Sequence, residues 1–268
     1  MKKKLNVLTI SYLLLLILLF LSGAFDGLLS DLVYFLAFLL PFALCIFLTR
    51  DEENKVKDCL NISRDDAMLF IPLIFPIISL TMLISFITSF IIFNLTGKTN
   101  MIDPGDSYVV ALIYHALLPT ILEEALFRYL PMRMIAPHSP RCAIIVSSIF
   151  FALVHGNLFQ IPYAFIGGII FMSLNLATES IIPSLVIHFI NNALSVTMMF
   201  IHDPFTLFLI YIFIGVVTLA CLSVAWKYRD DYEIPWLMIS DKGEGVIFTW
   251  QMIAFAVISL AISIISIL

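Results

Sequence analysis

The chain has 268 residues, of which 62% are hydrophobic and 12% are charged, and its mean hydropathy is +1.07. Soluble domains carry about 25% charged residues, so this composition excludes a soluble enzyme and indicates a polytopic protein of the lipid bilayer. The net charge of −5 at pH 7 argues against nucleic acid as a partner, because the sequence has no basic patch for phosphates.

Nine apolar stretches are long enough to cross about 30 Å of hydrocarbon at about 1.5 Å per helical residue. They lie at residues 5–23, 31–49, 68–94, 108–130, 142–159, 161–178, 181–201, 204–226 and 248–268. The fifth and sixth are the shortest, so whether they cross fully is left open. We expect an all-α bundle of about eight to nine transmembrane helices that forms one integral membrane domain over residues 1–268.

The basic residues between these stretches predict the orientation of the chain. They fall at alternate connections, which all lie on one side of the membrane, whereas Lys98 lies on the other. The residues on the basic side are Lys2, Lys3, Lys4, Arg50, Lys55, Lys57, Arg64, Arg133, Arg141, Lys227, Arg229 and Lys242. Because cytoplasmic loops carry the excess of lysine and arginine, we expect the N-terminus in the cytoplasm and the C-terminus outside.

The fourth stretch carries two adjacent carboxylates and an arginine, Glu123, Glu124 and Arg128. Each charge at the centre of a membrane helix costs about 2.5–3.5 kcal/mol, so such residues are functional candidates. Residues four apart share a helix face, which predicts an ion pair between Glu124 and Arg128. Glu123 points about 100° away and has no basic residue three or four positions from it. We expect its carboxylate to be poorly solvated and to act as a general base.

Two later stretches each place a histidine in an apolar helix. Phe151 and His155 lie four apart in the fifth stretch, and a second such pair, His188 and Asn192, lies in the seventh. His155 can share a water molecule with Glu123. His188 and Asn192 can donate hydrogen bonds to a carbonyl oxygen that becomes negative during acyl transfer. Together these residues are the parts needed to add water to a peptide carbonyl.

The three patterns resemble the signature motifs of a known family of intramembrane proteases. The motifs are Glu123-Glu124-x-x-x-Arg128, Phe151-x-x-x-His155 and His188-x-x-x-Asn192. They are similar to those of the CAAX protease and bacteriocin-processing family, also called the Abi family, which includes the Ras-converting CAAX endopeptidase. The resemblance covers residues 105–200. The compact spacing of the second and third motifs resembles that of prokaryotic members more than that of the eukaryotic enzymes.

The resemblance implies catalytic roles for four of these residues. It implies that Glu123 activates the attacking water with His155 as its partner. It also implies that His188 and Asn192 form the oxyanion site. No cofactor is implied, and the substrate would be a membrane-associated protein or peptide, with lipidated substrates included.

The same resemblance implies supporting roles for the remaining motif residues. Glu124 and Arg128 would form the supporting pair, and Phe151 would pack beside His155. Residues 105–200 would be the catalytic core of the single membrane domain, with a catalytic cavity inside the membrane. The location would be a prokaryotic cell membrane.

Three alternatives remain open at this point. The first is a zinc metalloendopeptidase with Glu123, His155 and His188 as ligands, since two histidines, a glutamate and an open water position make a catalytic zinc site. The second is a non-catalytic membrane scaffold, such as an immunity partner for a bacteriocin. The third is a proton-coupled transporter, because buried glutamates and histidines also form proton relays.

The predicted depths of these residues do not agree with one another. Glu123 and His188 each lie about seven residues from a cytoplasmic connection, which is roughly 10 Å along a helix. His155 lies about thirteen residues in, roughly 20 Å. Either the fourth helix continues past Pro131, or the proline-rich connection after it dips into the bilayer.

Overall fold

The computed structural model describes residues 1–49, 59–99, 105, 107–229 and 249–265. All regular secondary structure within these residues is helical. Six helices are long and apolar enough to span a membrane. These observations confirm the predicted fold class, an all-α polytopic membrane protein. The connections 50–58 and 230–248, which carry several of the basic residues that predict the orientation, lie outside the described residues.

The predicted apolar stretches correspond to helices. The six long helices are Lys2–Ser22 (α1), Gly27–Leu48 (α2), Arg64–Thr96, Tyr108–Met134, Ile182–Met199 (α10) and Pro204–Lys227 (α11). The three shorter apolar helices are Pro140–Val154 (α8), Ile161–Ala177 (α9) and Trp250–Ile265 (α13). With 15 and 17 residues, α8 and α9 are about 23 and 26 Å long, so each needs flanking residues to cross about 30 Å of hydrocarbon.

Two of the long helices are composite. The segment Arg64–Thr96 consists of α3 (Arg64–Phe70), a 3₁₀ turn η1 (Ile71–Leu73) and α4 (Ile74–Thr96). The segment Tyr108–Met134 consists of α5 (Tyr108–Ala111), η2 (Leu112–Leu117), α6 (Leu118–Glu124), η3 (Ala125–Tyr129) and α7 (Leu130–Met134). Both η2 and η3 are wide π-helical turns. Such turns are rare and frequently occur at functional sites.

The chain folds into two compact units. Unit 1 comprises Met1–Lys57, Leu122–Met172 and Ile239–Leu268, and unit 2 comprises Asp58–Ile121 and Ser173–Met238. The boundaries between them along the chain fall inside α6 and α9. The predicted core, residues 105–200, contributes to both units. The single membrane domain over residues 1–268 stays a prediction.

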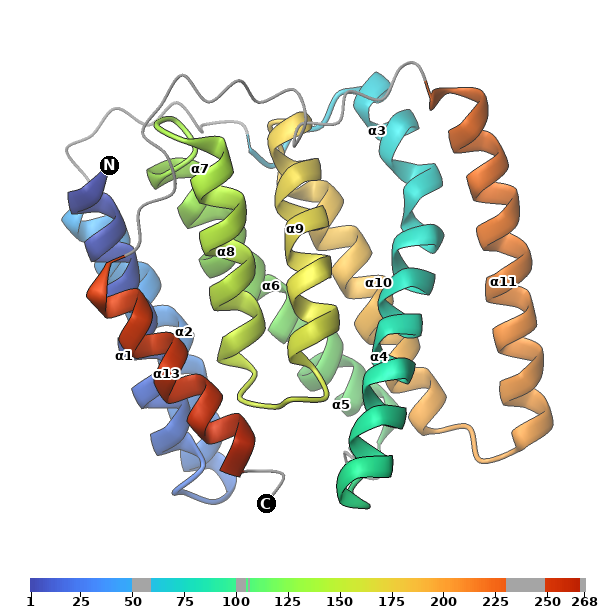
Figure 1. The fold of residues 1–268 in the computed structure, drawn as a ribbon, viewed down its shortest axis with the longest axis horizontal. Helices are drawn as coiled ribbons and strands as arrows, with labels where there is room; N and C mark the ends of the chain where they lie inside the picture. The colour runs from blue at the N-terminus through green and yellow to red at the C-terminus, as the bar shows by residue number, and fades with distance from the viewer. Residues whose placement is uncertain (50–58, 100–104, 106, 230–248, 266–268) are drawn as a thin grey trace. The chain divides into compact units, whose positions relative to one another are not determined.

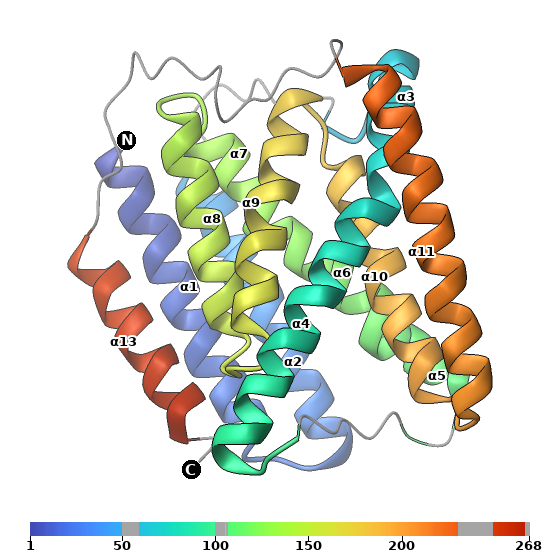
Figure 2. The ribbon, with the colours of Figure 1, turned by 45° about the vertical axis from the view of Figure 1, so that its right-hand side comes forward.

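Unit 1 has an aromatic core beneath its first and last helices. Helix α1 packs against α2 and α13, and α13 also packs against α8 (Figures 1 and 2). The ring of Tyr12 lies 5.0 Å from that of Phe127 and 4.7 Å from that of Phe150, which in turn lies 4.6 Å from Phe255. Aromatic pairs of this kind contribute about 0.5–1.5 kcal/mol each beyond their buried area. The two terminal helices therefore hold the helices that carry the first two motifs.

Unit 2 holds α10, the helix of the third motif, against two neighbours. Helix α10 packs against η2 and α4, and α4 also packs against α11. Small side chains allow the first of these contacts, because Ala111, Ala116 and Val196 form a buried cluster there. The hydroxyls of Ser79 on α4 and Thr218 on α11 share a hydrogen bond of 2.7 Å.

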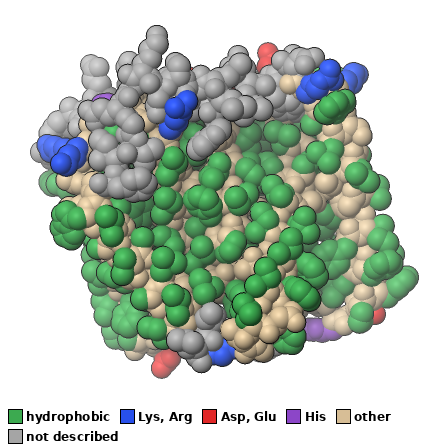
Figure 3. All heavy atoms as spheres, viewed as in Figure 1, with side chains coloured by type: hydrophobic (Ala, Val, Ile, Leu, Met, Phe, Trp, Pro, Cys, Tyr) green, Lys and Arg blue, Asp and Glu red, His purple; other side chains and the backbone are tan. Residues whose placement is uncertain are grey.

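Apolar side chains cover the outer faces of the helices. On the side shown in Figure 3, hydrophobic side chains lie over the helices, and lysine, arginine and acidic side chains appear near the helix ends. Helix α11 exposes Phe205, Phe208, Tyr211 and Phe213. A contiguous apolar surface of this kind is a liability in water but is the expected surface in lipid. The exposed faces therefore agree with an integral membrane protein.

The fourth apolar stretch is longer than predicted. We expected it to end at residue 130, whereas the helix continues through Pro131 to Met134. A proline inside a helix has no amide hydrogen, and its ring presses on the carbonyl four residues earlier. The π-helical turn η3 immediately before Pro131 widens the helix at that point, which relieves this contact.

This continuation reduces the mismatch in depth. Glu123 lies 11 residues before Met134 (134 − 123), which is about 17 Å along the helix rather than 10 Å. His155 follows Pro140 by 15 residues (155 − 140), or about 23 Å. The first of the two explanations, a fourth helix that continues past the proline, is therefore the one that the structure adopts.

Candidate active site

The seven motif residues divide between the two units. Glu123, Glu124, Arg128, Phe151 and His155 belong to unit 1. His188 and Asn192 belong to unit 2. Each group is described within its own unit.

The first motif contains a fully buried ion pair. The Nε atom of Arg128 lies 3.5 Å from Oε2 of Glu124, and both side chains are 0% exposed. The pair forms as the spacing of four residues predicts. A buried charge without its partner is strongly unfavourable, whereas a paired one is tolerated. The supporting role of this pair in the site stays a prediction.

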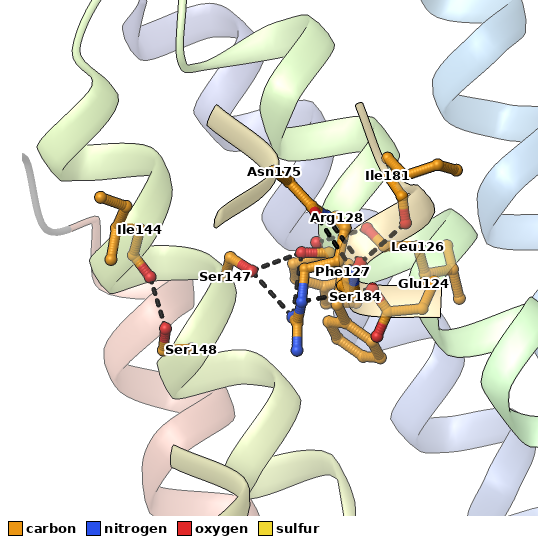
Figure 4. A network of polar contacts seen from close by, with 11 residues as sticks. Glu124, Leu126, Phe127, Arg128, Ile144, Ser147, Ser148, Asn175, Ile181 and Ser184 are labelled. Atoms are coloured by element: carbon orange, nitrogen blue, oxygen red, sulfur yellow. Dashed lines mark hydrogen bonds and ion pairs between the residues drawn. The ribbon is translucent and has the colours of Figure 1, made fainter. Parts of the chain in front are cut away.

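Arg128 is also held by side chains of α8 and α9. Its Nη1 atom donates to Oγ of Ser147 at 3.0 Å and to the carbonyl oxygen of Phe127 at 3.2 Å (Figure 4). The Cζ atom lies 4.3 Å from the ring centre of Phe151 and 5.6 Å from that of Phe171. Hydrogen bonds and aromatic faces both stabilise a guanidinium that has left water. Arg128 therefore joins the motif helix to its neighbours within unit 1.

Phe151 links the first motif to the second. One contact of its ring is the Arg128 guanidinium, and another is the imidazole of His155 at 5.2 Å with an interplanar angle of 88°. An edge-to-face arrangement is a favoured geometry for such rings. Phe151 thus packs beside His155, the geometry that the family resemblance implies.

The hydrogen bond of His155 determines which ring nitrogen carries its proton. Nδ1 lies 2.7 Å from the carbonyl oxygen of Phe151, and a carbonyl only accepts. The neutral imidazole therefore carries its hydrogen on Nδ1 and presents a lone pair on Nε2. His155 is positioned at the end of α8, where Gly156 adopts the left-handed φ of +56° that favours glycine. Helix α8 therefore ends at Val154, five residues before the predicted residue 159 (159 − 154).

The two adjacent glutamates have different surroundings. Glu124 is completely buried, whereas Glu123 is half-buried. Tyr34 of α2 and Tyr163 of α9 lie close enough for the charge of Glu123 to act on their hydroxyls. The greater desolvation thus falls on Glu124, which faces the interior of unit 1, and not on Glu123 as expected. The role of Glu123 as a general base stays a prediction.

In unit 2, His188 and Asn192 lie one turn apart on α10. The side chain of His188 is 5% exposed, and that of Asn192 is half-buried. Oδ1 of Asn192 accepts from Nδ2 of Asn191 at 3.4 Å, and Oδ1 of Asn191 lies 3.2 Å from the Thr81 hydroxyl of α4. With its oxygen engaged in this way, Asn192 keeps amide hydrogens for another acceptor. The role of these two residues as an oxyanion site stays a prediction.

A buried asparagine fixes the start of α10. Nδ2 of Asn175 donates to Oγ of Ser184 at 2.7 Å, and the backbone amide of Ser184 donates to Oδ1 of Asn175 at 3.2 Å. Free amides at a helix N-terminus need such acceptors. Because Ser184 precedes His188 by one turn, this bond fixes the position of the histidine along the helix axis.

Several residues of this framework were not predicted from the sequence. They are Tyr12, Thr81, Ser147, Asn175 and Asn191. Asn175 and Asn191 carried a usable signal, since an amide within an apolar stretch needs a hydrogen-bond partner. The hydroxyl residues carried none, because serine and threonine commonly bond to their own helix.

The question of a metal remains where the sequence left it. Among the described residues, no three side chains of His, Cys, Asp or Glu form a group that could hold a metal ion. The absence of a cofactor and its alternative, zinc, both stay predictions. The tautomer of His155 suits either one, because a metal-ligating histidine also donates its other N–H to a carbonyl.

The observations up to this point define a polytopic helical membrane protein with three motifs of an intramembrane protease. Residues 105–194 match the family described as Type II CAAX prenyl endopeptidase Rce1-like, and this segment contains all three motifs. No curated protein and no solved structure matches the chain. The chain belongs to the CAAX protease and bacteriocin-processing family.

Proposed function

We propose that the chain is an intramembrane endopeptidase that hydrolyses a peptide bond of a membrane-associated protein or peptide. Family membership supports the class of enzyme. The observation that carries the site is the contrast between two neighbouring glutamates. Glu124 is buried in an ion pair with Arg128, whereas Glu123 is half-buried. A general base has to reach water and substrate, which favours Glu123 for that role.

The proposed reaction needs only water and the side chains of the three motifs. The carboxylate of Glu123 accepts a proton from water as the water oxygen bonds to the peptide carbonyl carbon. The carbonyl electron pair moves to its oxygen, which His188 and Asn192 stabilise by donating hydrogen bonds. The carbon–nitrogen bond then breaks, and the leaving nitrogen takes the proton from Glu123. Nε2 of His155 accepts a hydrogen bond from the water and orients it.

Replacing His188 or Asn192 with alanine tests the oxyanion assignment. Each substitution is expected to lower kcat by about 10²–10³-fold, the usual effect of losing one oxyanion donor. Measurement of kcat and KM on purified protein checks this. His202→Ala and Asn94→Ala are matched controls, because both side chains are exposed in unit 2. A rise in KM with unchanged kcat would instead indicate a role in substrate binding.

Metal removal separates the glutamate mechanism from its zinc alternative. We expect purified protein to contain no stoichiometric zinc and to keep full activity in a strong chelator, because Glu123 and His155 handle the proton directly. Elemental analysis and activity assays with and without chelator measure this. Chelator-sensitive activity that returns on addition of zinc would contradict the metal-free mechanism.

Comparative peptidomics identifies the substrate and tests the function at once. Cells that carry the wild-type protein and cells that carry Glu123→Gln are compared, and uncut substrate is expected to accumulate with the variant. Full biological function of Glu123→Gln would favour the non-catalytic scaffold. Lipidated proteins are the first candidates, and a prokaryotic cell membrane is the proposed location. The N-terminus is proposed to be cytoplasmic, and a reporter fused to the C-terminus should then be active outside.

A further inference from the structure

Pro131 leaves carbonyl groups of the motif helix in need of other donors. In an α-helical pattern, the carbonyl of Phe127 would accept from the amide of residue 131, which proline does not have. The amide of Leu130 donates to the carbonyl of Ala125, five residues back. The Leu126 carbonyl therefore depends on a side chain for its hydrogen bond. Inside a membrane, water is not available to supply it.

Side chains from two other helices of unit 1 supply these donors. The hydroxyl of Tyr12 on α1 donates to the carbonyl oxygen of Leu126 at 2.8 Å. The hydroxyl of Ser147 on α8 donates to the carbonyl oxygen of Phe127. Tyr12 is the donor that comes from outside residues 105–194, the segment matched by the family. Helix α1 thus makes a direct polar contact with the motif helix.

The position of Tyr12 is closely determined by its surroundings. Its side chain is 0% exposed, as are those of Leu8 and Leu15, one turn before and one turn after it on α1. Its ring lies against those of Phe127 and Phe150 at 5.0 and 4.7 Å. Side chains packed in this way have few alternative rotamers. The hydroxyl therefore acts as a fixed donor and not as an adaptable one.

The carbonyl that Tyr12 binds lies in the middle of the first motif. Leu126 is two residues after Glu124 and two residues before Arg128, inside the π-helical turn η3. A π-helical turn contains one residue more than an α-helical turn. Conversion to the α-helical pattern would rotate the residues before it by about 100° and move them by about 1.5 Å relative to those after it. The bond from Tyr12 therefore bears on the direction in which Glu123 points.

We propose that Tyr12 is a positioning residue for Glu123. Its hydroxyl satisfies the carbonyl that Pro131 leaves without a backbone donor, and this bond holds the π-helical turn in the form that separates the paired Glu124 from the half-buried Glu123. The inference rests on the proposed function, because it assigns Glu123 to catalysis. It gives α1 a part in the site.

Tyr12→Phe removes the hydroxyl and keeps the ring. Purified Tyr12→Phe is expected to lose about 10- to 100-fold in kcat with little change in KM, because small displacements of a catalytic group have effects of this size. Thr9→Val is the matched control. Thr9 is 0% exposed on the same helix, and its hydroxyl donates to the Leu5 carbonyl of α1 itself at 2.8 Å. The pH–rate profile of Tyr12→Phe should also shift, whereas loss of folded protein would lower the rate equally at every pH.

A second measurement does not depend on activity. Residue 123 is changed to cysteine, and its rate of alkylation by a small maleimide is read by peptide mapping. Tyr12→Phe is expected to change this rate several-fold, and Thr9→Val is not. Equal alkylation rates with an unchanged pH–rate profile would overturn the proposal. A changed alkylation rate in a protein that cleaves no peptide would retain the positioning role and refute the proposed function.

Discussion

Glu123→Gln is expected to lower peptide cleavage by purified protein by about 10²–10⁴-fold, the usual contribution of a general base. An amide has nearly the shape of a carboxylate but cannot accept the proton from the attacking water. The amount of folded protein should stay close to that of the wild type, because Glu123 is half-buried and the ion pair of the neighbouring residue is untouched. Steady-state cleavage of a peptide substrate and size-exclusion chromatography measure the two quantities.

The neighbouring residue provides the decisive contrast. Glu124→Gln leaves Arg128 buried without its ion-pair partner, so this variant should mainly lose folded protein. Glu179→Gln is the matched control, since Glu179 is exposed and receives the same change of acid to amide. If Glu123→Gln and Glu124→Gln lost activity and folded protein to the same extent, the division of roles between the two glutamates would be wrong.

Local spacing explains which parts of the site were predictable. An ion pair between residues four apart depends only on the helix that carries both, so the sequence is sufficient to predict the contact of Glu124 with Arg128. The contact of Phe151 with His155 has the same origin. The apolar stretches were predictable because length and composition alone decide whether a helix can cross the bilayer.

Contacts between helices explain what was missed. Tyr12 bonds to a carbonyl 114 residues away along the chain, and no periodicity in an apolar helix marks one tyrosine for such a contact. A signal was nevertheless present, because a proline in a helix that continues leaves a carbonyl in need of a donor. Treating Pro131 as the end of the helix concealed that requirement. Gly156 likewise indicates the end of α8, since a glycine just after a helix commonly adopts the left-handed conformation.

Arg128→Ala is expected to destabilise the folded protein by about 3–5 kcal/mol, the usual cost of breaking a buried ion pair. Three contacts are lost at once: the ion pair with Glu124, the hydrogen bond to Ser147 and the contact with the ring of Phe151. Thermal unfolding in detergent measures the change. Arg229→Ala is the control, because Arg229 is exposed at the end of α11. Arg128→Lys should recover only part of the loss, since a lysine keeps the charge but not the planar donor group.

A double variant distinguishes the two sources of this loss. Arg128→Met combined with Glu124→Gln removes both charges, so no uncompensated charge remains buried, and such replacements often restore much of the stability. If the carboxylate left behind dominates the loss, the double variant should be more stable than Arg128→Ala. If the contacts with Ser147 and Phe151 dominate, the two should be equally unstable. We expect the first result, because a bare carboxylate in an apolar interior is more unfavourable than one missing hydrogen bond. Recovered stability without recovered cleavage would then show that the ion pair also serves the catalytic site.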